Sequence, residues 1–550
     1  MSGRRPAIPL LLAAALLLPA AAQAQQDRAL PPGALKILQR LAIQHNGREK
    51  PFDSFAREVL EQVTGSPHVG RAHPAETVLN LLAAPDAWQD APLVYVPFLP
   101  LREALGMDRK ASHVSYNELV ATRKLMRMLP VIVAKQQRDE KLSMLENETM
   151  DAFQRFVALS NLFEQKLSLV PPPPDSAERT WRSVLEPQGY PSDQQHAIRG
   201  AWTALVTAVR AGTAPQLEGA VADLRRVLQA AHPSAYPPAW RLGLEVFYNE
   251  AKPFRLARLL YALAACLLLV SLATHVPWAR SAGFGGLIAG YLLHGSGIIM
   301  RVVLGGRPPV SNFFETILWL PFVAVTIALV FERVYRVRFF GLAASLLAAI
   351  ALLIAEHVPL DTSITPVVAV LHSNLWLTIH VLTIVASYGA LTLATAMAHV
   401  YGTLYLARRG VHPALAALDL YLYRALQVGV VLLAAGVMLG AVWANASWGR
   451  YWGWDPKETW ALITLLWFLA ILHGRFAGWL RGVGVALSTI GGFFLLLMTY
   501  YGVSFYLVGL HSYAGGHAKP LPLLLVAYLA AEVLYLALVG SVALTRRPAA

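Results

Sequence analysis

Apolar stretches of nearly bilayer-spanning length fill the second half of this 550-residue chain. A helix needs about 20 mostly apolar residues to cross the hydrocarbon core of a membrane. Nine stretches meet this length, so the chain is predicted to be an all-α polytopic membrane protein with about nine transmembrane helices. These stretches are 256–274, 284–304, 314–331, 339–356, 374–405, 423–443, 458–474, 483–503 and 520–544. The fifth is longer than a bilayer requires and is expected to tilt or to project.

The composition also indicates a membrane protein and argues against nucleic-acid binding. Hydrophobic residues make up 56% of the chain and charged residues only 14%. The formal net charge of +13 lies mainly in the membrane half and at the extreme N-terminus, whereas residues 25–254 hold similar numbers of basic and acidic side chains. Basic loops on the cytoplasmic side of a membrane account for much of such an excess.

The first residues have the features of a secretory signal. Arg4 and Arg5 precede the apolar stretch 7–22, and an Ala-Gln-Ala cleavage site follows at 22–24. Residues 1–24 are therefore predicted to be a signal peptide, and the domain that follows is expected outside the cytoplasm.

Residues 25–254 are predicted to form a mainly helical extracytoplasmic domain. Helical patterning covers 117–133 and 150–169, and a run of four prolines then interrupts it. The histidines of this domain are scattered without metal-ligand spacing. Cys266 is the only cysteine of the chain, which excludes an internal disulfide and thiol–disulfide chemistry by this protein alone.

The transmembrane domain, 255–550, is expected to run its odd-numbered spans inward. The inner loops then carry most of the loop arginines, as the positive-inside rule requires. These are Arg280, Arg333, Arg336, Arg338, Arg408, Arg409, Arg475, Arg481, Arg546 and Arg547. This orientation puts the loop between the sixth and seventh spans, 443–460, on the outer face.

That outer loop is unusually rich in tryptophan. Five tryptophans fall within eighteen positions: Trp443, Trp448, Trp452, Trp454 and Trp460. One or two would be an ordinary aromatic belt at the membrane interface. Five of them, interleaved with Gly449, Tyr451, Asp455 and Lys457, indicate instead an aromatic platform suited to a large, flat, mostly apolar ligand.

The segment 443–464 resembles the tryptophan-rich WWD signature of the haem-handling proteins of cytochrome c biogenesis. Its continuation Asp-Pro-Lys-Glu-Thr-Trp-Ala-Leu-Ile-Thr is similar to the CcsA (ResC) branch of System II. The resemblance covers about 245–545 and is strongest near 307–315, 371–390, 419–473 and 502–514. Two shorter segments, 46–56 and 245–250, resemble regions upstream of the CcsA part in longer relatives.

The resemblance implies a function, a cofactor and partners. A CcsA-like protein of the bacterial inner membrane would carry haem b (iron protoporphyrin IX) outward and attach it covalently to apocytochrome c, as a holocytochrome c synthase or haem lyase. The partners implied are an apocytochrome with a Cys-x-x-Cys-His motif and thiol-reducing thioredoxin-like proteins. No CcsB-like stretch is seen in this chain, so a separate CcsB (ResB) subunit is a further partner unless His294 takes its role.

Four histidines fall at positions that the resemblance makes informative. His380 and His511 match the external haem ligands of CcsA relatives, and these two are the predicted catalytic residues. His473 matches an intramembrane haem ligand, and either His294 or a partner chain would supply the second one. Without the resemblance, a lone intramembrane histidine would be read as a structural residue. Neutral imidazole is a good axial ligand for haem iron.

Other side chains are expected to complete the haem site. Arg307, Arg450 and Lys457 are candidates to offset the propionate charges. Asp455 and Glu458 are either an acid–base pair or groups that shape the loop, and the second interpretation is preferred. The full predicted binding set is His294, His380, His473, His511, Trp443, Trp448, Gly449, Tyr451, Trp452, Trp454, Asp455, Lys457, Trp460 and Arg307. Ser504 stands where relatives usually have Asn, so it is an open question whether this position makes a specific hydrogen bond.

Two other classes of protein remain open at this point. A respiratory dihaem cytochrome b subunit would pair buried histidines across helices at fixed depth and would need no tryptophan-rich loop. A System I haem-handling protein would share the tryptophan motif but usually differs in length and span number. A transporter or scaffold without attachment activity is a third alternative.

Overall fold

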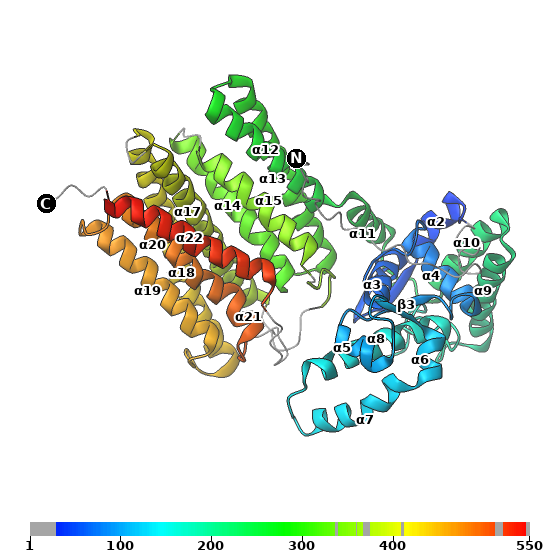
Figure 1. Ribbon diagram of the computed structural model, residues 1–550. Helices are drawn as coiled ribbons and strands as arrows, with labels where there is room; N and C mark the ends of the chain where they lie inside the picture. Colours follow the sequence, from blue (N-terminus) through cyan, green and yellow to red (C-terminus); the bar gives the residue numbers. More distant parts are fainter. Residues whose placement is uncertain are drawn as a thin grey trace, which may run out of the picture. The chain divides into compact units, whose positions relative to one another are not determined.

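The computed structural model describes residues 29–335, 339–358, 360–366, 374–408, 412–511 and 521–545 and separates into two compact units, Met1–Asn249 and Glu250–Ala550 (Figure 1). The predicted signal peptide lies outside the described residues. Helices dominate both units, as the sequence predicts.

The first unit is a helical domain with two small antiparallel sheets, β1–β2 and β3–β4. Its core is a single cluster of buried apolar side chains, among them Trp88, Phe52 and Leu79. The elements are α2 (Pro32–Gln39), β1 (Ala42–His45), β2 (Arg48–Pro51), α3 (Phe52–Thr64), α4 (Pro74–Ala83), η1 (Pro85–Ala87), β3 (Pro92–Tyr95), α5 (Leu99–Leu105), β4 (His113–Ser115), α6 (Tyr116–Thr122), α7 (Lys124–Gln137), α8 (Met144–Phe163), α9 (Ser192–Ala211), α10 (Ala214–Ala231) and α11 (Ala239–Ala251).

The two short segments that resemble upstream regions of longer relatives meet in this unit. Arg48 of β2 donates two hydrogen bonds, of 2.7 and 2.6 Å, to the carboxylate of Glu245 on α11, and both side chains are buried. Asn249 donates to Asp53 and to Ser54 at 2.9 and 2.8 Å. Bidentate Arg–carboxylate pairs fix geometry as well as charge. These contacts therefore hold α11 against the β1–β2 hairpin and α3.

The second unit holds the predicted spans. Nine helices in the described part of the chain are long and apolar enough to cross a membrane. The elements are α12 (Pro253–Thr274), α13 (Pro277–Gly305), α14 (Phe313–Tyr335), α15 (Phe339–His357), α16 (Asn374–Trp376), η3 (Leu377–Val381), α17 (Leu382–Ala407), α18 (Ala414–Trp448), α19 (Pro456–Phe476), α20 (Val483–Leu497), η4 (Met498–Gly502), α21 (Val503–Tyr506) and α22 (Leu523–Thr545).

Helix α17 is the centre of this bundle. It packs against α14 and α15 on one side and against α18 and α20 on the other, while α19 packs on α18 and α20. Figure 1 shows these helices running side by side. A close approach is possible because Gly389 of α17 lies against the carbonyl of Leu320, where an added Cβ would be only 2.6 Å from that oxygen. Small residues at interfaces are typical of packed membrane helices.

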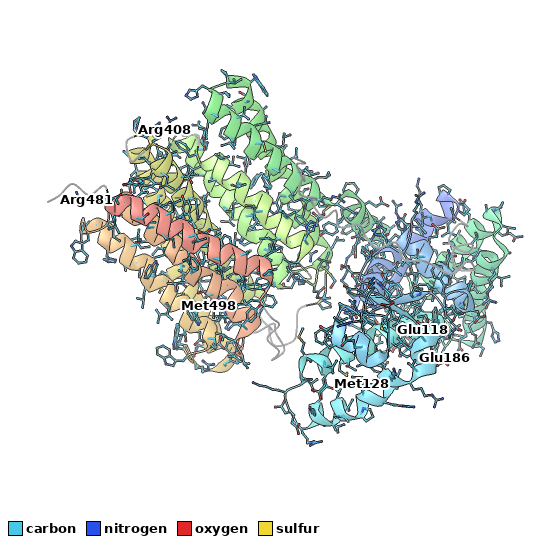
Figure 2. The ribbon with its side chains drawn as sticks, viewed as in Figure 1. Glu118, Met128, Glu186, Arg408, Arg481 and Met498 are labelled. Atoms are coloured by element: carbon cyan, nitrogen blue, oxygen red, sulfur yellow. The ribbon has the colours of Figure 1, made fainter. Side chains whose placement is uncertain are left out.

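Basic loop residues gather at one end of the bundle. Figure 2 shows Arg408 and Arg481 at that end and Met498, the first residue of η4, toward the opposite end. The predicted fifth span is not one regular helix, because α16 passes through the π-helical segment η3 before α17 begins. A second π-helical segment, η4, follows α20.

Candidate functional site

The tryptophan segment forms the turn between α18 and α19. Gly449 ends α18 in the left-handed conformation, with φ 70°, which favours glycine. Asp455 begins α19 as its N-cap, in a reciprocal capping box with Glu458. Pro456 occupies the first helical position, where its missing N–H is not needed. The local sequence thus dictates where one helix stops and the next starts.

His380 lies in the π-helical segment η3, against the last turns of α18. Its Nδ1 donates to the carbonyl of Gly436 at 2.9 Å, and its ring centre is 5.5 Å from that of Trp443. An added Cβ at Gly440 would be 2.7 Å from the ring, so glycine permits this approach. Because a carbonyl can only accept, Nδ1 carries the proton and Nε2 keeps its lone pair. A π-helical turn is often found at a functional site.

His511 is held from the other side of the tryptophan segment. Its Nδ1 lies 2.9 Å from Oδ2 of Asp455, while Oδ1 of Asp455 accepts from the backbone N–H of Leu510 at 2.7 Å. Burial raises the pKa of Asp455, but the hydrogen bonds from His511 and Leu510 outweigh it and lower the pKa to about 2. Asp455 is therefore ionised at neutral pH, accepts the Nδ1 proton, and leaves the lone pair of the His511 ring on Nε2.

The two imidazoles lie at the same end of α18. The ring of His511 is 6.3 Å from that of Trp448, and His380 contacts Trp443. These tryptophans are five residues apart, which is about 7.5 Å along a helix. The structure therefore brings His380, His511 and the tryptophan segment into one neighbourhood.

Three hydrogen-bond donors of this neighbourhood have no acceptor among the described residues. They are the indole N–H groups of Trp443 and Trp452 and one guanidinium nitrogen, Nη1, of Arg450. The nearest carboxylate oxygen to that nitrogen, on Glu458, is 3.8 Å away, which is too far for a hydrogen bond. A buried donor without a partner costs about 1–3 kcal/mol. A ligand that brings acceptor groups would remove this cost.

Glu458 and Lys457 are engaged within the protein. Glu458 accepts from the backbone N–H groups of Gly453 and Asp455 at 2.8 and 3.2 Å, which shapes the turn. Lys457 donates to the hydroxyl of Ser504 at 2.9 Å and to the carbonyl of Tyr500 at 3.2 Å, so it joins α19 to η4 and α21. Ser504 therefore accepts a specific hydrogen bond, which answers the question left open by the sequence.

Arg307 is part of a buried ion triad at the end of α13. Its guanidinium donates to Glu315 at 2.7 Å and to the carbonyl of Thr365 at 2.9 Å, and Arg301 donates to the same carboxylate at 2.9 Å. All three charged side chains are nearly inaccessible to solvent. A propionate at Arg307 would have to compete with these partners.

His294 and His473 are not brought together. His294 is fully buried on α13, among the rings of Phe254 and Phe322, and its Nε2 has no hydrogen-bond partner among the described residues. His473 is exposed on α19, where Nδ1 donates to the carbonyl of Leu469 at 2.8 Å. Helix α13 packs on α12, α14 and α15, whereas α19 packs on α18 and α20. The cross-helix pairing expected of a dihaem cytochrome b is thus absent for these two histidines.

One partly buried polar cluster was not predicted from the sequence. His399 of α17 lies 2.9 Å from the carboxylate of Glu532 on α22, and Tyr535 donates to the carbonyl of His399 at 3.0 Å. Ionisable residues at membrane depth are costly and usually paired. A glutamate within the apolar stretch 520–544 was the available signal, but its partner is 133 residues away.

Comparisons with known proteins find relatives of the membrane-spanning part of the chain. The family model described as "Cytochrome C assembly protein" matches residues 310–511. The CcsA protein of Chlorella vulgaris is 32% identical over 300 residues, which cover 45% of this chain and 94% of that protein. The CcsA protein of Prochlorococcus marinus strain NATL2A is 34% identical over 254 residues, or 40% of this chain and 80% of that protein.

A longer relative extends the match toward the N-terminus. Protein NrfI of Wolinella succinogenes is 29% identical over 508 residues, which cover 86% of this chain but only 54% of NrfI. The chain thus spans about half the length of that relative. The family places the protein in cytochrome c biogenesis and haem handling, and the nine apolar helices make it a multi-pass membrane protein. The chain belongs to the CcsA family of cytochrome c biogenesis proteins.

Proposed function

We propose that this protein is a holocytochrome c synthase that binds haem b between His380 and His511 and attaches it to apocytochrome c. One observation carries this proposal. Each of the two imidazoles has its Nδ1 occupied by an acceptor, so each presents a lone pair on Nε2. Haem-ligating histidines are oriented in this way by partners on their other ring nitrogen.

The surroundings of the two imidazoles fit a haem. Indole rings of the tryptophan segment can cover the apolar face of the macrocycle. Haem propionates are carboxylates, and the groups that would bind them are the donors of Trp443, Trp452 and Arg450 that find no acceptor in the part of the chain that the structure describes. Tyr451 and Trp454 are strongly exposed and could contact the incoming apocytochrome.

The attachment chemistry makes few demands on this chain. Each thiol of the apocytochrome Cys-x-x-Cys-His motif adds across a haem vinyl group: sulfur bonds to one vinyl carbon, the thiol proton goes to the other, and no net redox change occurs. The histidine of the motif then replaces one of the two protein ligands on the iron. Positioning is the main contribution. Asp455 and Glu458 are engaged in the turn, which supports a shaping role rather than acid–base catalysis.

Haem delivery from the inner side is a second part of the proposal. His473 would hold haem near the inner leaflet before it moves outward. His294 or a CcsB (ResB) partner would supply the second ligand there, and the separation of α13 from α19 supports the partner. The bacterial inner membrane is the proposed location, with the N-terminal domain and the tryptophan segment on the periplasmic side. Thioredoxin-like proteins would keep the substrate thiols reduced.

Haem content is the direct test. The protein purified from haem-replete cells should give a pyridine haemochrome spectrum of b-type haem that acidified solvent extracts. The His380→Ala, His511→Ala double variant should lose the share of this haem that these two histidines bind, while haem held at His473 would remain. His357→Ala is the matched control, because His357 is an exposed membrane-helix histidine bonded to its own helix. Folded wild-type protein without haem would refute the proposal.

A further inference from the structure

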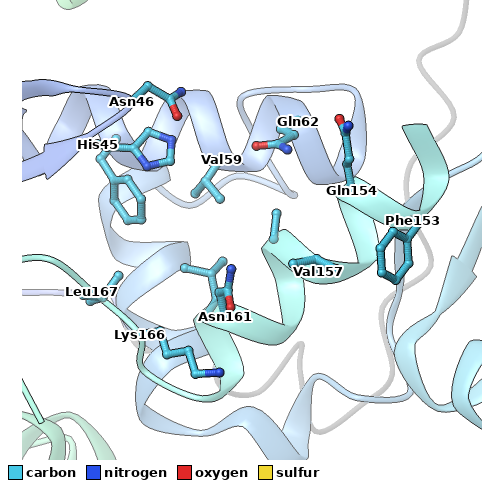
Figure 3. Close-up of a pocket in the computed structure, with 13 residues that line it drawn as sticks. His45, Asn46, Val59, Gln62, Phe153, Gln154, Val157, Asn161, Lys166 and Leu167 are labelled. Carbon is cyan, nitrogen blue, oxygen red and sulfur yellow. The ribbon is translucent and has the colours of Figure 1, made fainter. Parts of the chain in front are cut away.

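A cavity of about 380 Å³ opens in the N-terminal unit between α3, α8 and the tip of the β1–β2 hairpin. Figure 3 shows His45, Val59 and Gln62 on one side of it and Val157 and Asn161 of α8 on the other. This volume is near the lower end of the roughly 300–1,000 Å³ that small-ligand sites occupy. The cavity therefore has room for a short segment of a ligand rather than for a domain.

The polar lining consists mainly of side-chain amides. Asn46, Gln62, Gln154 and Asn161 all line the cavity. None of these four amides makes a side-chain hydrogen bond to another residue in the described part of the chain. Each amide offers two donor hydrogens and an acceptor oxygen. That combination matches the N–H and C=O groups of an extended peptide backbone.

The cavity offers little net charge to a ligand. Burial, together with the nearby Lys50 ammonium, lowers the pKa of His45 to about 4, so the imidazole is neutral at physiological pH. Lys166, the one cation of the lining, is paired with Glu164 at 2.5 Å. Phosphate or carboxylate ligands would find no uncompensated positive charge here, whereas a neutral peptide backbone needs none.

The floor of the cavity is apolar. Phe55 and Val59 come from α3, and Val157 and Leu162 from α8. The ring of His45 packs edge-on against Phe55 at 5.1 Å. An apolar floor with amides around it can bury one aliphatic or aromatic side chain while the amides bind the flanking backbone.

We propose that this cavity binds a short extended segment of the apocytochrome polypeptide. The inference rests on the proposed function, which makes a haem-free cytochrome the substrate. Such a chain lacks the group around which its core packs and therefore exposes backbone N–H and C=O groups that need partners. Recognition through backbone groups would accept many sequences, and a cavity on the N-terminal unit would hold the substrate independently of the haem ligands.

The test uses the full-length protein in detergent and a fluorescein-labelled peptide with a Ser-x-x-Ser-His core, which cannot form thioethers. Binding is followed by fluorescence anisotropy. Ala158→Trp fills the cavity, and the Gln154→Ala, Asn161→Ala double variant removes two amides. Both should raise the Kd at least about tenfold, since one lost hydrogen bond changes affinity by a factor of about 5. Asp151→Trp, exposed on the same helix and not part of the lining, should stay within twofold.

Three results would overturn the inference. The first is that both cavity variants bind the peptide with wild-type affinity, while their far-UV circular dichroism spectra show that they are folded. The second is loss of peptide binding in His511→Ala but not in Ala158→Trp, which would put the peptide at the haem site and leave the proposed function intact. The third is loss of a second haem equivalent in Ala158→Trp on titration with haemin, which would make the cavity a haem site.

Discussion

The two histidines beside the tryptophan segment, His380 and His511, are held differently from His473. His380 and His511 are each fixed by a partner from another part of the chain, a carbonyl of α18 and the carboxylate of Asp455. Among the described residues, His473 bonds to the carbonyl of Leu469 on its own helix, whereas Nδ1 of His294 lies 3.4 Å from the hydroxyl of Tyr261 on α12 and its Nε2 has no hydrogen-bond partner. A binding site keeps its productive geometry when hydrogen bonds from the same chain fix its side chains. We therefore expect His380 and His511 to bind their ligand without a partner chain, whereas His473 would need a second ligand from elsewhere.

The largest effect should come from removing an outer ligand. We expect His380→Ala or His511→Ala to lower the yield of holocytochrome c by more than about 100-fold. Loss of a residue that only hydrogen-bonds to a metal ligand already lowers metal affinity or activity by about 10–100-fold, and loss of the ligand itself should cost more. Imidazole added to the medium should restore part of the yield by filling the vacant coordination position. Haem-stained gels of a co-expressed cytochrome measure this yield. Two fully active variants would remove the basis for calling the outer site a ligand pair.

Replacing His473 should lower haem occupancy more than replacing His294. His473→Ala is expected to reduce haem occupancy of the whole protein, measured by Soret absorbance at matched expression, because haem would pass His473 first. His294→Ala should leave occupancy near wild type if a partner chain supplies the second ligand. An equal loss in both variants would instead make His294 that ligand, despite its distance from α19 in the packing of the bundle.

Replacing Asp455 should have a smaller effect, limited to haem bound beside His511. We expect Asp455→Ala to lower outer-site haem retention by about 10–100-fold, while haem at His473 persists, because His511 loses the partner that orients it. Asp455→Asn keeps an acceptor oxygen and should cost less. Since the pKa of Asp455 is about 2, the carboxylate stays ionised above pH 4, and the difference between wild type and Asp455→Asn should not change between pH 5 and 8. A strong pH dependence in that range would contradict this assignment.

The smallest effect should come from a single indole N–H. Trp443→Phe keeps an aromatic ring beside His380 but removes the indole N–H, which has no acceptor within the described ranges. We expect haem affinity to fall by a factor of about 5, the equivalent of one hydrogen bond. Trp479→Phe, an exposed tryptophan outside the segment, is the control. Equal affinities in the two variants would mean that the Trp443 donor does not reach a propionate.

Some of this architecture could be predicted from the sequence because it depends on local patterns. The spans follow from the lengths of apolar stretches, and the end of α18 and start of α19 follow from Gly449 and the Asp455–Glu458 capping box. The grouping of His380 and His511 near the tryptophans came from the resemblance to CcsA proteins.

Other features depend on packing between distant segments and leave no local pattern. The π-helical segment η3 has an apolar sequence like that of an ordinary membrane helix. The bond between Asp455 and His511 joins residues 56 positions apart. The pairing of His399 with Glu532 likewise needs α22 to lie against α17. Periodicity and spacing describe one helix at a time, so they cannot identify such partners.

The two π-helical segments also have a consequence for comparing relatives and for engineering. Each π turn holds one residue more than an α-helical turn, and each residue of an α-helix rotates the chain by about 100°. Deleting one residue from η4 would therefore turn Ser504 away from Lys457 while leaving α20 unchanged. A single-residue gap at either segment in an alignment of CcsA proteins would mark a rotated helix end, and thus a differently aimed side chain, rather than a neutral change in length.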